Sequence, residues 1–525
     1  MVTTRLASHL NPCLRILPLH FSLLRYNTTT AAKPPTLNFR DTQQTYRSKS
    51  TMELLRSLAI LKSCTYPAFV NNSERLMRVS RTLLGARMFE YVMKRSFYGQ
   101  FAGGEDIAEL QPCVEHLARY GVHSMLNYSV EADVGAPGDE GTCQGNLDTL
   151  IQVLESSKEV CSGRPFSSFK ITGLTSPQLL FQFTEVLAGL KGVFEKCSTV
   201  SVEHGGFTGS LADEIRGNKT LFINRVLTRE AFVALTNSQE LFDSADTRSC
   251  GYLDFYQFRD TMLANPTVLA TLGTVPALTE EVISGSERLR VRLAHIVAKT
   301  KELDARIMID AEQTYLQPAI DFFTRELMRE HNRDTVYIFN TYQCYLRSTP
   351  NTLTQDARDA AQHGYSLGVK LVRGAYMDQE RARAGELGCA SPIHDTKQGT
   401  DSAYHAMLDV VLVLVTRDQG RLLAGSHNEE TVRYLMERMA LLHITPDKVY
   451  FGQLYGLCDP TTFLLSGSGY TVFKAIAWGP VEAVLPFLAR RAQENTGVLG
   501  GDTRELDLLK TEIWRRIFAS RALDG

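Results

Sequence analysis

Eight short apolar segments that alternate with longer helical ones constrain the fold of this 525-residue chain more than any other feature. The eight segments are VHSMLNY (122–128), SFKITGL (168–174), RIMIDAE (306–312), VYIFNTY (336–342), LGVKLVRGAY (367–376), LLAGSH (422–427), VYFGQL (449–454) and YTVFKAI (470–476). Their near-continuous apolar character is typical of strands buried on both faces of a parallel sheet. Eight strand–helix units predict an α/β fold, a (β/α)8 barrel of the TIM type with insertions.

An open doubly wound sheet is the alternative, but the dinucleotide fingerprint that it would need is missing. The nearest candidate, SGSGYT (466–471), lacks the third glycine and follows no predicted strand. We therefore favour the barrel.

The first 40 residues differ in composition from the rest of the chain. They contain no Asp or Glu, and their basic residues stand among Ser, Thr and Leu. This is the composition of a mitochondrial transit peptide, with a disordered basic tail as the alternative. We expect residues 1–40 to be a targeting segment and the protein to reach the mitochondrial matrix.

Three further regions follow. Residues 51–120 are predicted to be helical, because SERLMRVSRTLLGARMFEYVMKRSFYG carries apolar residues three and four positions apart. Residues 121–520 form the predicted barrel, and the long gap at 195–285 is predicted to hold a helical insert.

The insert contains DTRSCGYLDFYQF, which resembles a calcium-binding EF-hand loop that has lost ligands. Asp246, Gly251 and Leu253 fit the pattern, whereas Arg248, Cys250 and Gln257 occupy ligand positions. A hard cation needs several carboxylate oxygens. We predict an EF-hand-like helical hairpin without calcium, and chance similarity is the alternative.

Composition excludes several classes of protein. A formal net charge of −2 gives no electrostatic basis for nucleic-acid binding. The ten cysteines are scattered, without zinc-like spacing, and the histidines are too dispersed for a metal site, so we predict reduced thiols and no metal. No apolar run approaches the roughly 20 residues that a membrane-spanning helix needs.

Polar side chains stand toward the ends of five of the predicted strands, where the chemistry of a barrel takes place. They are Lys170, Asp310, Glu312, Asn340, Lys370, Arg373, Tyr376, His427 and Asn428. Taken singly, each is more often a hydrogen-bonded structural group than a catalyst. Together they predict one polar mouth that could bind a polar ligand.

Two adjacent arginines, Arg490 and Arg491, lie in PFLARRAQEN after the last predicted strand. On an isolated helix such a pair is usually solvated. At a barrel mouth two guanidinium groups could bind one carboxylate or phosphate, and Glu494 could orient either of them.

Six motifs in order make the chain resemble the mitochondrial proline dehydrogenase (proline oxidase) family, including its hydroxyproline dehydrogenase branch. The motifs are IDAEQTY (309–315), FNTYQCYL (339–346), KLVRGAY (370–376), SHNEETVR (426–433), FGQLYGLCD (451–459) and RRAQEN (490–495). The resemblance covers the chain from about Thr51, is strongest between Ile307 and Asn495, and is weak through the insert.

The resemblance implies a distorted (β/α)8 barrel that binds FAD. It implies oxidation of L-proline, or of 4-hydroxy-L-proline, to the corresponding Δ1-pyrroline-5-carboxylate, the first step of proline catabolism. It further implies ubiquinone as electron acceptor and association with the surface of the inner mitochondrial membrane.

The resemblance also implies roles for residues of this chain. Asp310 and Lys370 match catalytic positions. The positions that bind the substrate carboxylate are matched by Lys170, Arg490 and Arg491, and those that line its ring by Tyr376, Leu454 and Ala475. The flavin contacts are matched by Ala311, Asn340, Arg373, Gly374, Ala375, Ser426 and His427.

One departure bears on the substrate. KAIAWGP (474–480) has Ala475 where proline-specific members of the family usually have Tyr. A small residue leaves room for a hydroxyl group on the ring, so we expect 4-hydroxyproline to be accepted. Two other classes remain as alternatives: a barrel lyase or aldolase with Lys170 or Lys370 as a Schiff-base nucleophile, and a calcium-responsive adaptor built around Asp246.

Overall fold

A closed barrel of eight parallel strands forms the centre of the protein, as predicted. The computed structural model describes residues 37–128, 140–161, 163–201, 224–247, 249–499 and 504–521. The strands are β1 (Val122–Tyr128), β2 (Phe166–Phe169), β6 (Arg306–Ile309), β7 (Ile338–Gln343), β8 (Leu367–Val372), β9 (Gly420–Gly425), β10 (Val449–Leu454) and β11 (Thr471–Trp478). Their order around the barrel is β1-β11-β10-β9-β8-β7-β6-β2.

All eight strand predictions correspond to barrel strands, but the second is displaced. β2 begins at Phe166 and ends at Phe169, and a 3-10 turn over Ile171–Gly173 (η2) takes the place of the predicted continuation. Lys170 therefore stands directly after the strand, where the backbone turns away from the barrel.

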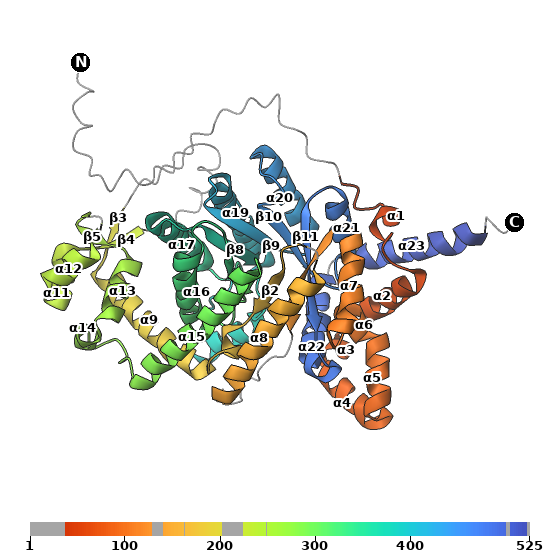
Figure 1. Ribbon diagram of the computed structural model, residues 1–525, viewed down its shortest axis with the longest axis horizontal. Coiled ribbons are helices and arrows are strands. Elements are labelled where there is room, and N and C mark those ends of the chain that lie inside the picture. Colours follow the sequence, from red (N-terminus) through yellow and green to blue (C-terminus); the bar gives the residue numbers. More distant parts are fainter. Residues whose placement is uncertain are drawn as a thin grey trace, which may run out of the picture.

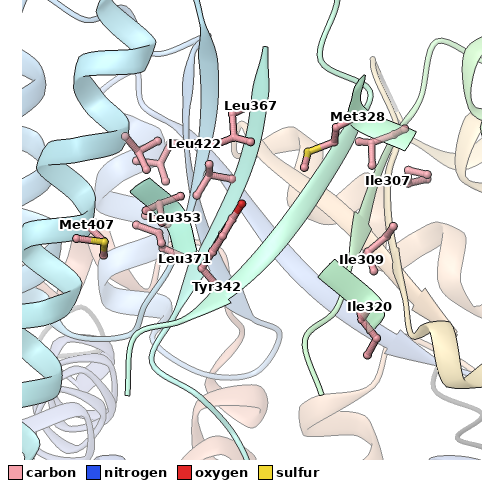
Figure 2. Packing of buried hydrophobic residues seen from close by; sticks show 14 of the residues in the cluster. Ile307, Ile309, Ile320, Met328, Tyr342, Leu353, Leu367, Leu371, Met407 and Leu422 are labelled. Carbon is pink, nitrogen blue, oxygen red and sulfur yellow. The ribbon is translucent and has the colours of Figure 1, made fainter. Parts of the chain in front are cut away.

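Helices cover the barrel and supply the outer layer of the core. They are α7 (Ile107–Arg119), α8 (Glu140–Val160), α9 (Pro177–Cys197), α15 (Glu280–Glu302), α16 (Gln317–His331), α17 (Thr349–His363), α18 (Met377–Glu386), α19 (Lys397–Thr416), α20 (Glu429–Leu441), α21 (Asp459–Gly467) and α22 (Val481–Leu499). Figure 2 shows part of this layer, in which Ile309 and Tyr342 from the strands lie among Ile320, Leu353 and Met407 from the helices.

A second, smaller core fills the barrel interior. It contains Met125, Phe166, Met308, Phe339 and Phe473, one from each of five strands. Because successive side chains of a strand point to opposite faces, these residues identify the inward positions of their strands. The aromatic rings occupy the lower part of the interior, and the ends of the strands lie above them.

The predicted N-terminal helical region is present and packs beside the barrel together with the last helix. It comprises α2 (Thr51–Ser63), α3 (Pro67–Asn71), α4 (Ser73–Leu84), α5 (Ala86–Arg95) and α6 (Phe97–Phe101), preceded by α1 (Thr42–Thr45). α23 (Arg504–Arg521) packs against α1 and α2. The insert within residues 195–285 lies at the opposite end of the molecule from α1 to α6 and α23 (Figure 1).

The insert is mainly helical but also contains a small antiparallel sheet that the sequence did not predict. Its elements are α11 (Arg229–Thr236), α12 (Gln239–Ala245), α13 (Phe255–Ala264), α14 (Pro266–Thr271) and the strands β3 (Thr199–Ser201), β4 (Asn224–Thr228) and β5 (Tyr252–Leu253). Phe232, Phe242 and Phe258 form its own core.

The EF-hand-like loop joins α12 to α13, which gives the predicted helix–loop–helix shape. Both carboxylate oxygens of Asp246 accept backbone N–H groups, from Cys250 at 2.8 Å and from Gly251 at 2.7 Å. Gln257 and Asp254 form a capping box at the start of α13. Arg248 lies outside the described residues. The acidic side chain at the first position is thus satisfied by the loop itself.

Candidate active site

Charged side chains meet inside the barrel above the aromatic layer. The Nζ of Lys370 donates to the Oδ1 of Asp310 at 2.6 Å. Lys370 lies in β8 and Asp310 follows β6, and β7 separates the two strands. This ion pair therefore bridges two non-adjacent strands at the barrel mouth.

Lys170 and Glu312 extend this charged group. Burial raises the pKa of Glu312, and the ammonium group of Lys170 opposes the rise, so the two side chains lie within electrostatic reach of each other. The carboxylate of Glu312 accepts the hydroxyl of Thr172 at 2.8 Å. The mouth thus places two lysines and two carboxylates at the ends of β2 and β6 and on β8.

The predicted role of Asn340 does not agree with its position. Its amide points away from the barrel interior, is 1% exposed, and donates to Asp321 of α16 at 2.9 Å. Burial raises the pKa of Asp321 to about 6, which shows how closed this outer site is. The interior positions of β7 are instead those of Thr341 and Gln343, which the sequence analysis missed.

Arg373 is held in one place by three partners. Its guanidinium group donates to Asp401 at 2.8 Å, to the hydroxyl of Ser426 at 2.8 Å and to the hydroxyl of Thr431 at 2.9 Å. It also lies over the ring of Tyr404. A guanidinium group that is fixed in this way provides a preorganised positive charge for an anionic ligand.

A cleft of about 460 Å³ lies beside Arg373. Asp401 and Thr431, which bind the guanidinium group, also line it. α19 and α20 begin here, at Lys397 and Glu429, with Thr396 and Asn428 as their N-caps. Lys397 and Glu430 also line the cleft, so its lining carries charges of both signs.

The backbone after β8 passes close to a neighbouring ring. Gly374 has φ +134°, and an added Cβ would lie 2.5 Å from the ring of Tyr345. Only glycine fits here. Gly374 and the following Ala375 are exposed, and Tyr376 precedes the first turn of α18, half-buried. The chain therefore presents backbone rather than side chains to the space above β8.

Ser426 and His427 follow β9 and point in different directions. The hydroxyl of Ser426 accepts from Arg373, whereas the Nε2 of His427 accepts the N–H of Leu454 at 3.0 Å. His427 therefore acts as a hydrogen-bond acceptor at Nε2. The ring of His427 thus ties the ends of β9 and β10 together.

Leu454 and Ala475 are partners in the pairing of β10 with β11. Ala475 packs against the interior core, two positions above Phe473 on the same face of β11. Leu454 packs against the cluster that includes Val484 and Phe487 of α22. The two residues predicted to line a substrate ring are therefore neighbours.

Arg490 lies half-buried in α22, the helix that follows β11. α22 packs against α3, α4, α5 and α6. Arg491 belongs to the same helix, but its side chain lies outside the part that the structure describes. The pairing of the two guanidinium groups therefore stays a prediction. Ala311, which follows Asp310, is buried at the end of β6.

The sequence analysis also missed a buried lysine in the same strand as Ala475. Lys474 precedes Ala475 in β11 and is fully buried. Its Nζ lies 3.0 Å from Asp459 Oδ1, donates to the carbonyl of Leu454 at 3.2 Å and also donates to that of Leu457. Lys49 binds the other oxygen of Asp459 at 2.5 Å. The sequence feature that could have identified this lysine is its position as the single charged residue in the segment YTVFKAI.

Known proteins resemble the chain over most of its length. The sequence profile of the proline dehydrogenase family matches residues 110–502. Human proline dehydrogenase 1, mitochondrial, is 34% identical over 93% of this chain and 92% of its own. The hydroxyproline dehydrogenase of Xenopus laevis is 34% identical over 97% of both chains, and the human one is 31% identical over 90% of this chain and 92% of its own.

Solved structures support the fold. Proline utilization A from Bdellovibrio bacteriovorus, inactivated by N-propargylglycine, superposes with a TM-score of 0.56 at 17% identity, over 90% of this chain and 40% of that one. The protein of the same name from Corynebacterium freiburgense gives a TM-score of 0.51 at 15% identity, over 86% of this chain and 35% of that one. This chain thus spans less than half the length of those proteins.

Proposed function

The chain belongs to the proline dehydrogenase family, and we propose that it oxidises L-proline and 4-hydroxy-L-proline with FAD as its cofactor and ubiquinone as the electron acceptor. One observation carries the proposal: the Lys370–Asp310 ion pair at the barrel mouth. A second feature agrees with it, the fixed guanidinium group of Arg373, whose partners Asp401 and Thr431 line a cleft. An amino-acid substrate needs the first feature, and a dinucleotide needs the second.

The residues around the cleft fit FAD. Arg373 offers a fixed positive charge toward the pyrophosphate, and the N-termini of α19 and α20 add backbone N–H groups. The exposed backbone of Gly374 and Ala375 lets a flat ring system approach closely. Ser426 and His427 complete the predicted contact set. Asn340 does not belong to it, and Gln343 takes its place on the interior face of β7.

Bound FAD would supply the redox chemistry, by accepting a hydride from C5 of the substrate ring. The protein's part is to hold that ring and to control its charge. Lys170, Arg490 and Arg491 are proposed to bind the substrate carboxylate. Three cations around one carboxylate disfavour a protonated ring nitrogen, so the neutral amine that can form the imine is preferred.

Lys370 is proposed to keep a positive charge at the bottom of the mouth. Asp310 accepts a hydrogen bond from its ammonium group at 2.6 Å and holds that group in place. A cation here would stabilise the negative charge that a reduced cofactor carries. The Schiff-base lyase would need the same nitrogen to attack a carbonyl carbon, whereas here it is bonded to a carboxylate.

Ala475 is proposed to allow a hydroxyl group on C4 of the ring. Since the residue faces the interior with only a methyl group, no bulky side chain excludes 4-hydroxyproline from that side. An apolar gap discriminates against an added hydroxyl by only about 10²-fold or less. A dedicated hydroxyproline dehydrogenase is the second candidate, which the same alanine favours.

Anaerobic reduction of the purified protein tests the proposal. L-proline and trans-4-hydroxy-L-proline should each bleach the flavin absorbance, and reoxidation by a soluble ubiquinone analogue should restore it. A colourless protein, or a yellow protein that neither amino acid bleaches, would refute it. The names of the relatives and the basic N-terminal composition support a mitochondrial location.

A further inference from the structure

Two neighbouring helices outside the barrel expose apolar side chains in rows. On α4 the residues are Leu76, Val79 and Leu83, spaced by three and four positions. On α5 they are Met88, Tyr91 and Val92. Exposed fractions run from 41% to 79%. We call these six residues the α4–α5 apolar face. Monomeric soluble proteins seldom expose large apolar patches, and such patches mark binding sites.

The same helices bury their other sides, so this face is not a displaced part of the core. Met77 of α4 and Phe89 and Met93 of α5 pack into the cluster that also contains Phe487 and Leu488 of α22. α4 and α5 touch each other and α22. Figure 1 shows them at the outer edge of the molecule, away from the barrel. The buried sides of α4 and α5 thus pack against the rest of the protein, and the α4–α5 apolar face is directed outward.

Basic residues accompany the face. The sequences of α4 and α5 contain six basic residues and two acidic ones, a net charge of +4. The basic residues are Arg75, Arg78, Arg81, Arg87, Lys94 and Arg95. Two of them are paired with acidic residues outside these helices, Arg81 with Glu482 and Lys94 with Glu105 and Glu109, so the exposed Arg75, Arg78, Arg87 and Arg95 carry the positive charge of the face. Arg95 lies over the ring of Tyr91. The partner that fits is therefore apolar and negatively charged at once.

We propose that the α4–α5 apolar face lies in the headgroup layer of an anionic lipid bilayer. An amphipathic helix with arginines beside leucine, valine and tyrosine binds such a surface by burying its apolar side at the boundary of the acyl chains. Each arginine near an anionic surface adds to the affinity. The proposed function includes electron transfer to ubiquinone, which requires contact with a membrane. The inference locates that contact, and it rests on the proposed function only for the reason why the protein would bind a membrane.

A second copy of the chain fits the face less well. A symmetric dimer would place the same exposed arginines against each other. Like charges oppose such an interface, whereas they strengthen binding to anionic lipid. None of the helices that the structure describes is long and apolar enough to cross a membrane. Contact at the surface is the arrangement that these helices permit.

Flotation of the full-length protein with vesicles tests the proposal. Wild type should bind phosphatidylcholine vesicles that contain cardiolipin, bind pure phosphatidylcholine vesicles much more weakly, and be released by salt. The triple variant Leu76→Gln, Val79→Gln, Leu83→Gln should bind at least about tenfold more weakly. These side chains are exposed, so the variant keeps its packing.

A matched control replaces exposed apolar residues elsewhere. Ile283→Gln, Val291→Gln and Leu441→Gln change side chains of similar exposure in α15 and at the end of α20, and should leave binding unchanged. Equal binding to both kinds of vesicle, or an unchanged triple variant, would overturn the proposal. So would a wild-type dimer that the triple variant converts to monomers, because a second copy would then be the occupant.

Activity with a soluble dye as electron acceptor separates this inference from the proposed function. The triple variant should oxidise proline with the dye at the wild-type rate. If the wild type itself shows no activity with the dye, the proposed function is refuted, whereas the vesicle result still holds. Loss in the variant alone would assign the face a structural role and overturn the inference.

Discussion

Replacement of Lys474 by methionine should be among the most destabilising single changes in the barrel. Methionine fills nearly the same volume but cannot donate a hydrogen bond. The change leaves the carbonyls of Leu454 and Leu457 without their charged donor and takes one of two cations from Asp459. Asp459 is itself buried, and the lysines that face it keep its pKa well below the usual range.

The expected size of the effect follows from burial. Removal of one partner from a buried ion pair costs about 3–5 kcal/mol, because the remaining charge has no water to replace the lost partner. Asp459 keeps Lys49 at 2.5 Å, so the lower end of that range, about 3 kcal/mol, is expected for Lys474→Met. The free energy of unfolding in urea is the quantity to measure, with the fluorescence of Trp478 as the reporter, since this residue ends the same strand.

Lys448→Met is the matched control. Its ammonium group also lies 3.1 Å from a carboxylate, that of Asp418, but both partners are partly exposed, so a loss of about 1 kcal/mol or less is expected. If Lys474→Met cost no more than Lys448→Met, the buried network would contribute no more than a surface pair and the reasoning would fail. The double variant Lys474→Met, Asp459→Asn should lose less than the sum of the two single changes.

Four further outcomes are expected. Arg490→Ala should lower kcat/KM for proline at least about 30-fold while FAD stays bound, by steady-state kinetics and flavin absorbance; a loss of about threefold or less would place this side chain outside the site. Ala475→Tyr should suppress oxidation of 4-hydroxyproline selectively, and an equal fall for both substrates would contradict the proposed ring contact. Burial raises the pKa of Glu505 from its ordinary value of 4.5 to about 7, so the folded state prefers the protonated acid. That stabilisation is complete below the unfolded pKa and is lost as the pH rises through the folded one, so Glu505→Gln should raise Tm at about pH 8 and hardly at about pH 5, whereas equal shifts would speak against a titrating Glu505. Calcium at about millimolar concentration should leave Tm unchanged in a thermal melt, and a stabilisation that Asp246→Ala abolishes would show that the loop binds the ion.

The barrel could be predicted because its strands are buried on both faces. A run such as VYFGQL has no polar face, and that absence indicates a parallel sheet covered by helices. The same property hides which side chains point inward. In FNTYQ the sequence does not distinguish the outward Asn340 from the inward Thr341 and Gln343, since no alternation is visible. The error over Asn340 has this physical cause.

The candidate site was predictable only where its residues follow strands. Asp310, Lys370 and Arg373 stand at strand ends, which a barrel brings together. The partners that fix Arg373 do not: Asp401 lies in the first turns of α19, 28 residues later in the chain, and no local pattern connects the two. The buried network around Lys474 likewise joins residues 49, 459 and 474, which only the finished fold brings into contact.

The closure between β1 and β11 sets the order in which the molecule can be built. These strands pair along seven residues, from Val122 with Val472 to Tyr128 with Trp478. Arg516 of α23 donates to the carbonyls of Tyr46 and Lys49, so the start of the described chain is also held by its end. As the polypeptide emerges from a ribosome or an import pore, its first strand has no final partner on this side until almost the whole chain has passed. A nascent chain therefore carries an open, apolar sheet edge for most of its synthesis, and long-range closure of this kind is slow. Chaperones that shield such edges should determine how much of the protein reaches its folded state.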